Sequence, residues 1–243
     1  MKSFKKQFRA ISFMLVCCLL AVSVFSSQAF AATSNDSPNV QLYYAQQGGP
    51  GEAAYDGYFG SIAVKNLGYE KKVTLHYTQD GVNWSDSDAS YSKADPNDSE
   101  YDIWTFAILS PSSPITFTIK YEVNGQTYWD NNNGKNYSLN FSNIAVLGKS
   151  VLKTIRRYPL SDYPYIIYLK NIDYQKIVKV RYTTDNWSSY QEVNATYSKA
   201  ENANIDEWNI PGSIPIGAKF EVLYSVSGTT YTDNNFGDFY TYY

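Results

Sequence analysis

The feature that most constrains this chain is an internal duplication with a period of about 105 residues. The segment VKNLGYEKKVTLHYTQDGVNW, which starts at Val64, returns as LKNIDYQKIVKVRYTTDNW, which starts at Leu169. ASYSKA at 89–94 returns as ATYSKA at 195–200, and YEVNGQTYWDNN returns as YSVSGTTYTDNN. Solenoid repeats are much shorter than this period, which instead fits a β-sandwich domain written twice.

The pattern within each copy indicates strands. KVTLHYT, ITFTIKYEV and KIVKVRYT alternate apolar and polar residues, and tyrosine, a strand former, accounts for 24 of the 243 residues. Asn124-Gly125 and Ser227-Gly228 are type I′ hairpin signals at equivalent places. We predict an all-β protein with module 1 at 38–141 and module 2 at 144–243. In module 1 we expect strands near 40–45, 58–67, 72–79, 102–109, 115–123 and 126–130.

Residues 1–31 have the order of a secretory signal peptide. Four basic residues precede an apolar run at 11–25, and Ala29-Phe30-Ala31 is a small-x-small cleavage site. A retained membrane anchor is the alternative. Cleavage would remove both cysteines, Cys17 and Cys18, so the modules cannot depend on disulfides. It would also change the net charge from −3 to about −7, which disfavours nucleic acid and anionic membranes as partners. We expect a secreted, extracellular protein.

No catalytic set can be assembled from the residues. The single histidine, His76, is expected on the outward side of its strand and is interpreted as a plain surface residue. No Ser-His-Asp or Cys-His arrangement is available, although paired carboxylates for glycoside hydrolysis stay open as an alternative. DNNNG resembles the start of a calcium loop, but its twelfth position is Phe141, so we favour a self-capping turn. We therefore expect no enzyme, no metal and no cofactor.

Aromatic and amide side chains outside the core indicate a carbohydrate-binding surface. A sugar ring packs its C–H face on an indole or phenol, and carboxamides hydrogen-bond to its hydroxyls. Trp84 and Trp187 lie in the polar contexts GVNWSDS and DNWSSY, typical of loops, and Trp129 adjoins DNNNG. We expect these three indoles to be exposed. Trp104 and Trp208, which lie in alternating segments, are expected to be buried.

VKNLGYEKKVTLHYTQDGVNW followed by YEVNGQTYWDNNNGKNY resembles carbohydrate-binding module family 21, the starch- and glycogen-binding module. The resemblance covers essentially all of module 1 and most of module 2. It implies two immunoglobulin-like antiparallel β-sandwich domains in tandem that bind starch, glycogen or a related α-1,4-glucan and catalyse nothing. It also implies two surface sites in each module.

Matched position by position, the resemblance implies the site residues of module 1. The first site would use Trp84, Trp129 and Asn131, with the acidic side chain of Asp102 nearby. A tyrosine that assists this site in the family falls at Thr118 here. The second site would use Asn66, Tyr69, Lys71 and Tyr91.

Module 2 keeps most of this set and departs from it at one aromatic position. It has Thr232 where module 1 has Trp129. We therefore predict that module 2 binds mainly through Tyr174 and Tyr197 and is the weaker module, and that the linked pair gains affinity through avidity. The residues that it keeps are Trp187, Asn234, Asn171, Tyr174, Lys176 and Tyr197.

Three other interpretations stay open. An extracellular or cell-surface adhesion protein could use the same sandwiches for protein contacts. An accessory subunit of a separate amylolytic enzyme would agree with glucan binding. A phosphatase-targeting subunit would need a docking motif, for which Lys179–Tyr182 offers only a chance near match within a strand.

Overall fold

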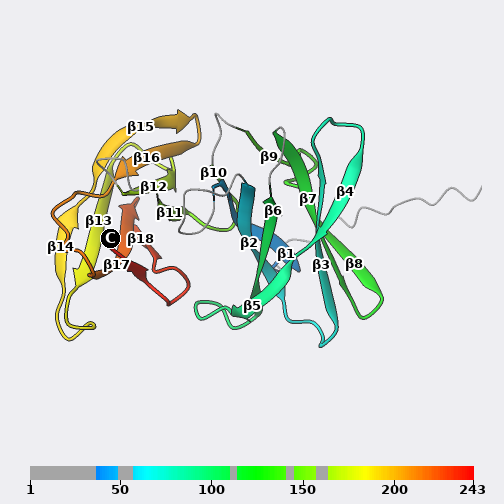
Figure 1. Ribbon diagram of the computed structural model, residues 1–243, viewed down its shortest axis with the longest axis horizontal. Coiled ribbons are helices and arrows are strands. Elements are labelled where there is room, and N and C mark those ends of the chain that lie inside the picture. Colours follow the sequence, from blue (N-terminus) through cyan, green and yellow to red (C-terminus); the bar gives the residue numbers. More distant parts are fainter. Residues whose placement is uncertain (1–36, 49–56, 110–113, 141–144, 157–163) are drawn as a thin grey trace, which may run out of the picture. The chain divides into compact units, whose positions relative to one another are not determined.

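The computed structural model describes residues 37–48, 57–109, 114–140, 145–156 and 164–243, all within one compact unit. The predicted signal peptide lies outside the described residues. Every regular element in the described ranges is a β-strand (Figure 1). Within the same ranges, no helix has the length and apolar character that a membrane span needs.

Two antiparallel sheets form the first sandwich (Figure 1). One has the strand order β10–β1–β2–β6–β5, and the other has the order β4–β3–β7–β8, with β9 also paired to β7. Their bounds are β1 (Val40–Gln47), β2 (Gly57–Lys65), β3 (Lys71–Thr78), β4 (Trp84–Asp88), β5 (Ser90–Ala94), β6 (Tyr101–Leu109), β7 (Ile115–Val123), β8 (Gln126–Asp130), β9 (Tyr137–Leu139) and β10 (Ala145–Leu147).

The second sandwich repeats the arrangement, with β11–β19 following the order of β1–β9. Its sheets have the orders β11–β12–β16–β15 and β14–β13–β17–β18, with β19 paired to β17. Their bounds are β11 (Leu152–Arg156), β12 (Tyr165–Lys170), β13 (Lys176–Thr183), β14 (Gln191–Asn194), β15 (Thr196–Asn202), β16 (Ile205–Asn209), β17 (Lys219–Val226), β18 (Thr229–Asp233) and β19 (Tyr240–Thr241).

The prediction of an all-β chain with tandem antiparallel sandwiches is confirmed, whereas the immunoglobulin-like description stays a prediction. One strand departs from the expected division of the chain. β10 falls within the range predicted for module 2, but it pairs with β1, where Leu147 lies opposite Tyr44. By hydrogen bonding, the first sandwich therefore extends beyond the predicted boundary.

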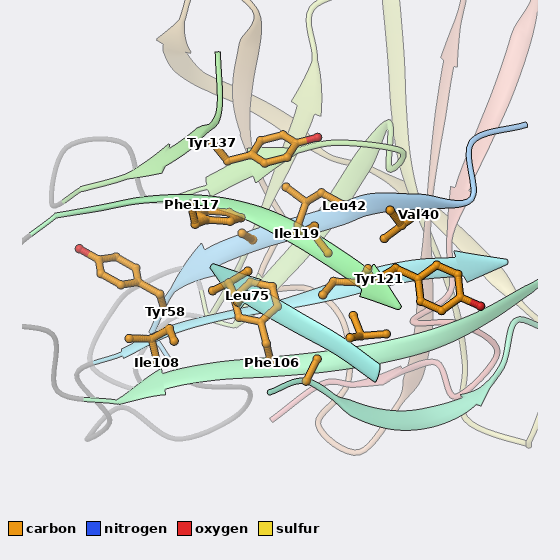
Figure 2. Close-up of a cluster of buried hydrophobic side chains, with 14 of the residues drawn as sticks. Val40, Leu42, Tyr58, Leu75, Phe106, Ile108, Phe117, Ile119, Tyr121 and Tyr137 are labelled. Atoms are coloured by element: carbon orange, nitrogen blue, oxygen red, sulfur yellow. The ribbon is translucent and has the colours of Figure 1, made fainter. Parts of the chain in front are cut away.

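Each sandwich has its own hydrophobic core. In the first, Leu42 and Ile62 come from one sheet and Leu75 and Phe117 from the other, and all four are fully buried. Figure 2 shows Leu42, Leu75 and Phe117 among the side chains gathered between the strands. Burying each such side chain contributes roughly 1.5–3 kcal/mol. Because alternate residues of a strand face opposite ways, the partners of these core residues are displayed on the outer faces of the sheets.

Buried tyrosines complete the cores through hydrogen bonds to the backbone. The Tyr121 hydroxyl donates to the Lys65 carbonyl at 2.8 Å, and the Tyr224 hydroxyl donates to the Lys170 carbonyl at 2.9 Å. A buried phenol therefore keeps a partner for its polar end. This repeated contact ties the end of β2 to β7 and the end of β12 to β17, next to the surfaces described below.

Both predicted hairpins are confirmed. Asn124 and Gly125 have φ values of 51° and 72°, and Ser227 and Gly228 have values of 49° and 78°. Positive φ at both central residues is the requirement of a type I′ turn. These turns fix the registers of β7 with β8 and of β17 with β18.

Candidate functional site

Two tryptophans lie on the outer face of the β4–β3–β7–β8 sheet. Trp84 is the first residue of β4, opposite Thr78, and Trp129 lies in β8, opposite Lys120. Trp84 is 38% exposed and Trp129 is 50% exposed. Both indoles extend from strands. Trp129 lies in the strand expected near 126–130, whereas the polar sequence context of Trp84 predicts a loop. Their exposure agrees with the prediction.

His76 joins the two indoles. Its ring stacks on Trp84 with centroids 4.8 Å apart and planes inclined by 13°, and it meets Trp129 edge-on at 5.9 Å and 77°. Its Nδ1 lies 2.6 Å from Asp86 Oδ1, and this hydrogen bond lowers the pKa of the Asp86 carboxyl. Lys120 Nζ lies 3.7 Å from the other carboxylate oxygen of Asp86. We call Trp84, His76 and Trp129 the indole face.

Sequence reasoning places His76 correctly at the surface but misses its place between the indoles. His76 lies opposite Asp86 on β4 and opposite Thr118 on β7. The small Thr118 side chain lies between β3 and β8, the strands that carry His76 and Trp129. Finding this contact needs the register of β4, a polar strand that the sequence pattern does not reveal.

The turn before Trp84 is held by a carboxylate. Asp80 Oδ1 accepts the backbone N–H groups of Asn83 and Val82 at 2.7 and 2.8 Å. These hydrogen bonds hold the pKa of the Asp80 carboxyl well below its usual range. These hydrogen bonds fix the backbone just before Trp84, the residue at which β4 begins.

The Asn-rich segment after β8 is a turn, as predicted. Its four positions with positive φ, between 52° and 85°, are Asn132, Asn133, Gly134 and Asn136. Asparagine and glycine tolerate this left-handed backbone better than other residues, which explains the composition. Asn131 is exposed, and its Oδ1 accepts the Gly134 N–H at 2.9 Å. Its amide N–H groups are therefore the part of the side chain suited to a ligand.

Asp130 anchors this turn to the rest of the sandwich. Its carboxylate accepts the Leu42 N–H at 2.7 Å, the Asn132 N–H at 3.2 Å and the Tyr137 hydroxyl at 2.8 Å. The carboxylate is thus engaged by the chain itself. In the part of the chain that the structure describes, no three His, Cys, Asp or Glu side chains gather as a metal site would need.

The predicted second site of module 1 contains two exposed phenols and a buried ion pair. Tyr69 is 99% exposed, and Tyr91 is exposed while its ring meets Trp104 edge-on at 6.0 Å. Asn66, three residues before Tyr69 in the chain, is also exposed. Lys71 is largely buried, and its Nζ lies 2.9 Å from Asp102.

Asp102 therefore lies with Lys71, which corrects its expected place beside the first site. It is on β6, in the sheet opposite the indoles, and its side chain is only 8% exposed. A buried carboxylate needs a compensating charge, and Lys71 supplies it. Both charges are engaged with each other, so the exposed parts of this site are the phenols and Asn66.

The second sandwich repeats this arrangement closely. Tyr174 is 94% exposed, and Tyr197 meets Trp208 edge-on at 5.8 Å. Lys176 Nζ lies 2.9 Å from Asp206 and donates to Asn171 Oδ1 at 2.7 Å. The structure brings the four predicted residues together in one groove of about 1310 Å³, lined by Asn171, Tyr174, Lys176 and Tyr197 with others.

Trp104 and Trp208 are half-buried at the margins of the two cores, instead of fully buried as expected. Their outer edges support the exposed phenols Tyr91 and Tyr197. Each indole therefore connects a core to a surface.

The face of the second sandwich that corresponds to the indole face is different. Trp187 is half-buried in a turn, which corrects its expected exposure, and its ring packs on Phe239 with centroids 4.6 Å apart. Thr232 is exposed at the place of Trp129. Phe239 was missed by sequence reasoning. Alignment of the two copies could have found it, because the second copy has an aromatic residue, Phe239, where the Asn-rich turn of the first copy has Asn136.

Charged residues occupy the centre of this second face. Arg181, at the place of His76, lies 2.9 Å from Glu192 and 3.3 Å from Glu221. The Tyr190 ring lies 4.6 Å from the guanidinium. Burial raises the pKa of the Glu221 carboxyl, and Arg181 opposes that rise. The face is thus an ion-pair network with an aromatic edge.

Asn234 caps its turn as Asn131 does, but its side chain is less exposed. Its Oδ1 accepts the Gly237 N–H at 2.9 Å, and the residue is half-buried. In the same turn, the Phe236 carbonyl and the Asp238 carboxylate both contact Lys93 Nζ, at 2.8 and 2.6 Å. Lys93 therefore occupies this side of the turn, whereas the equivalent residues of the turn after β8, Asn133 and Lys135, are exposed.

Comparison with known proteins finds one family in both sandwiches. The model of the carbohydrate/starch-binding module of family 21 matches residues 36–140 and 165–242. Glucoamylase 1 of Rhizopus oryzae is 41% identical over 129 residues, which are 51% of this chain and 20% of that protein. Protein phosphatase 1 regulatory subunit 3C of Bos taurus is 41% identical over 86 residues, 33% of this chain and 27% of that protein.

Among solved structures, the starch binding domain of Rhizopus oryzae glucoamylase in complex with beta-cyclodextrin and maltoheptaose is 36% identical. The match covers 44% of this chain and 98% of that domain, with a TM-score of 0.35. The chain spans only about a fifth to a quarter of the two curated relatives.

Proposed function

Because the chain belongs to carbohydrate/starch-binding module family 21, we propose that it is a secreted, non-catalytic protein that binds starch, glycogen or a related α-1,4-glucan. The observation that carries the proposal is the pair of half-exposed indoles, Trp84 and Trp129, on one outer face. Indole rings bind the C–H faces of glucose units, and the exposed Asn131 amide supplies donors for hydroxyls nearby.

The nearly fully exposed phenols of Tyr69 and Tyr174 support further contacts in both sandwiches. Linked weak sites on one polymer raise apparent affinity by effective concentration, roughly a hundredfold or more when the geometry allows both to engage. A starch granule or glycogen particle offers many adjacent chains. We therefore propose that avidity across the two sandwiches produces tight adsorption from individually modest sites.

Secretion and partners are parts of the same proposal. The order of residues 1–31 supports export. The glucoamylase relative is compatible with an accessory role beside a separate amylolytic enzyme. The phosphatase subunits among the relatives suggest a protein partner, but the near match to a docking motif does not support one here. Lys179–Tyr182 lies inside β13, where Val180 and Tyr182 are buried.

Adsorption to raw starch, with cellulose as the control polymer, tests the proposal. The wild-type chain should be depleted from solution by starch granules and left in solution by cellulose. The double variant Trp84→Ala/Trp129→Ala should adsorb much less, whereas Tyr243→Ala, which removes an exposed ring outside the proposed sites, should adsorb normally. Equal retention on both polymers, or on neither, would overturn glucan binding.

A further inference from the structure

We propose that His76 is itself a glucan-binding and specificity-determining residue of the indole face. It would accept a hydrogen bond from a sugar hydroxyl through Nε2 and set the angle between the two indoles. The inference rests on the proposed function and adds a residue that the family resemblance does not assign.

The hydrogen-bond chemistry of the imidazole follows from its partner. Nδ1 of His76 lies 2.6 Å from Asp86 Oδ1. An ionised carboxylate can only accept, so Nδ1 must carry the hydrogen of this bond. In the neutral ring, Nε2 then has a free lone pair and acts as an acceptor. The His76 side chain is 34% exposed, so this edge is within reach of a ligand that lies across the indole face.

The ring geometry adds a steric role. His76 is nearly parallel to Trp84, at 13°, and steeply inclined to Trp129, at 77°. The two indoles are therefore steeply inclined to each other, with the imidazole as the spacer. His76 covers one face of Trp84 and leaves its other face for a sugar. Steeply inclined platforms suit a glucan that curves from one unit to the next and do not suit a flat ribbon.

The charged surroundings keep the imidazole in place. Asp86 is also close to Lys120 Nζ, at 3.7 Å, and Lys120 pairs in turn with Glu122 at 3.3 Å. The carboxylate therefore has a cation on its second oxygen and remains available to His76 on its first. The second sandwich shows the alternative, because Arg181 at this place pairs with Glu192 and Glu221 and its guanidinium lies over the Tyr190 ring.

The experiment measures maltoheptaose binding by titration calorimetry with the full chain in a Tyr69→Ala/Tyr174→Ala parent. This background removes the most exposed phenol of each of those sites, so that the remaining signal reports mainly the outer faces. His76→Phe keeps a flat ring between the indoles but cannot accept a hydrogen bond. It should bind about three- to tenfold more weakly, which is the range expected for one net hydrogen bond. His76→Ala also loses the spacer and should bind more weakly still.

Two controls make the outcome decisive. Trp84→Ala/Trp129→Ala in the same parent defines the loss of binding by both indoles. Ile216→Ala, which removes an exposed apolar side chain outside the proposed sites, should change nothing. Tryptophan emission should stay near that of the parent in His76→Phe and shift in His76→Ala. His76→Phe therefore still tests the hydrogen bond if His76→Ala is poorly folded.

Each outcome has one meaning. If the parent binds maltoheptaose and both His76 variants bind it as tightly as the parent does, the role of His76 is refuted and glucan binding stands. If only His76→Ala is impaired, the hydrogen bond through Nε2 is refuted. If neither the parent nor the wild-type chain binds maltoheptaose, the proposed function fails and this inference fails with it.

Discussion

The indole face of the first sandwich and the corresponding face of the second have the same backbone register and different chemistry. His76 lies opposite Asp86 and Thr118, and Arg181 lies opposite Glu192 and Glu221 in the same pairing. Around His76, the small Thr118 leaves room for two indoles to contact the imidazole. Around Arg181, ion pairs with Glu192 and Glu221 fill the same area. Residues on an outer face thus changed freely while the strand pairing beneath them stayed the same.

The interior shows the opposite behaviour. Lys71–Asp102 and Lys176–Asp206 have the same distance, 2.9 Å, and both are largely buried. Asp130 and Asp233 also accept the same hydrogen bonds, from a first-strand N–H and from a tyrosine hydroxyl. Groups whose burial demands a partner are kept in both copies, because losing one partner destabilises the fold.

The largest expected effect tests this shared interior. Asp102→Ala and Asp206→Ala each leave a buried lysine unpaired and should lower the free energy of unfolding by about 3–5 kcal/mol. Chemical denaturation of the full chain measures the loss. Glu100→Ala, which removes an exposed partner of Lys65, should cost less than about 1 kcal/mol. A large loss at only one of the two buried pairs would break the equivalence of the sandwiches.

The next effect tests the difference between the faces. Trp84→Ala/Trp129→Ala should weaken starch binding about tenfold to a hundredfold, because an aromatic platform contributes on the order of 1–3 kcal/mol. Trp187→Ala should have a smaller effect, because Trp187 is half-buried against Phe239 and has no second indole. Adsorption isotherms on granules compare the variants. Equal losses would show that the two faces bind alike despite Thr232.

A smaller effect asks what the second face lacks. Thr232→Trp alone should improve binding less than about threefold, because Arg181 and Glu221 remain beneath the new ring. Arg181→His/Glu221→Thr/Thr232→Trp copies the first face and should improve it about tenfold. Maltoheptaose titration measures both. If the single variant gains as much as the triple one, the imidazole and the small residue are unnecessary.

The smallest effect concerns the turns that precede Trp84 and Trp187. Hydrogen bonds donated by Ser189 lower the pKa of Asp185 to about 2, and the corresponding turn also lowers the pKa of Asp80. A depressed native pKa stabilises the fold above the ordinary value of about 4. This contribution is lost as the pH falls through the native value. Asp185→Asn should therefore flatten the decrease in unfolding free energy between pH 4 and 2. An unchanged pH profile would show that the turn contributes nothing.

The sequence predicts much of this fold because alternation and turn chemistry are local properties. The six expected strands of the first sandwich and both hairpins are present. The sequence does not reveal β4, which reads WSDSD, because it lies at a sheet edge with mostly exposed side chains and has no apolar alternation. β9 and β10 have only three residues each, too few to show a period.

The candidate sites also combine features that neighbouring residues predict with features that depend on strand pairing. The exposure of Tyr69, Trp84 and Trp129 follows from the neighbouring residues in the chain. The burial of Lys71 does not, because its partner Asp102 comes from the other sheet. The place of His76 between two indoles depends on the pairing of β3 with β4 and, through β7, on β8, which is distant in sequence. Contacts of this kind become visible only when the register is known.

The anchoring of the Asn-rich turn by Asp130 has a consequence for ligand capture. Three donors from separate parts of the chain converge on one carboxylate, so the turn acquires its shape when the sandwich folds. For a sugar bound at Asn131, as we propose, the surface is already ordered, and little mobility remains to be lost on association. Even a shallow, open recognition surface can then discriminate among ligands, because its rigidity was established before any ligand arrived.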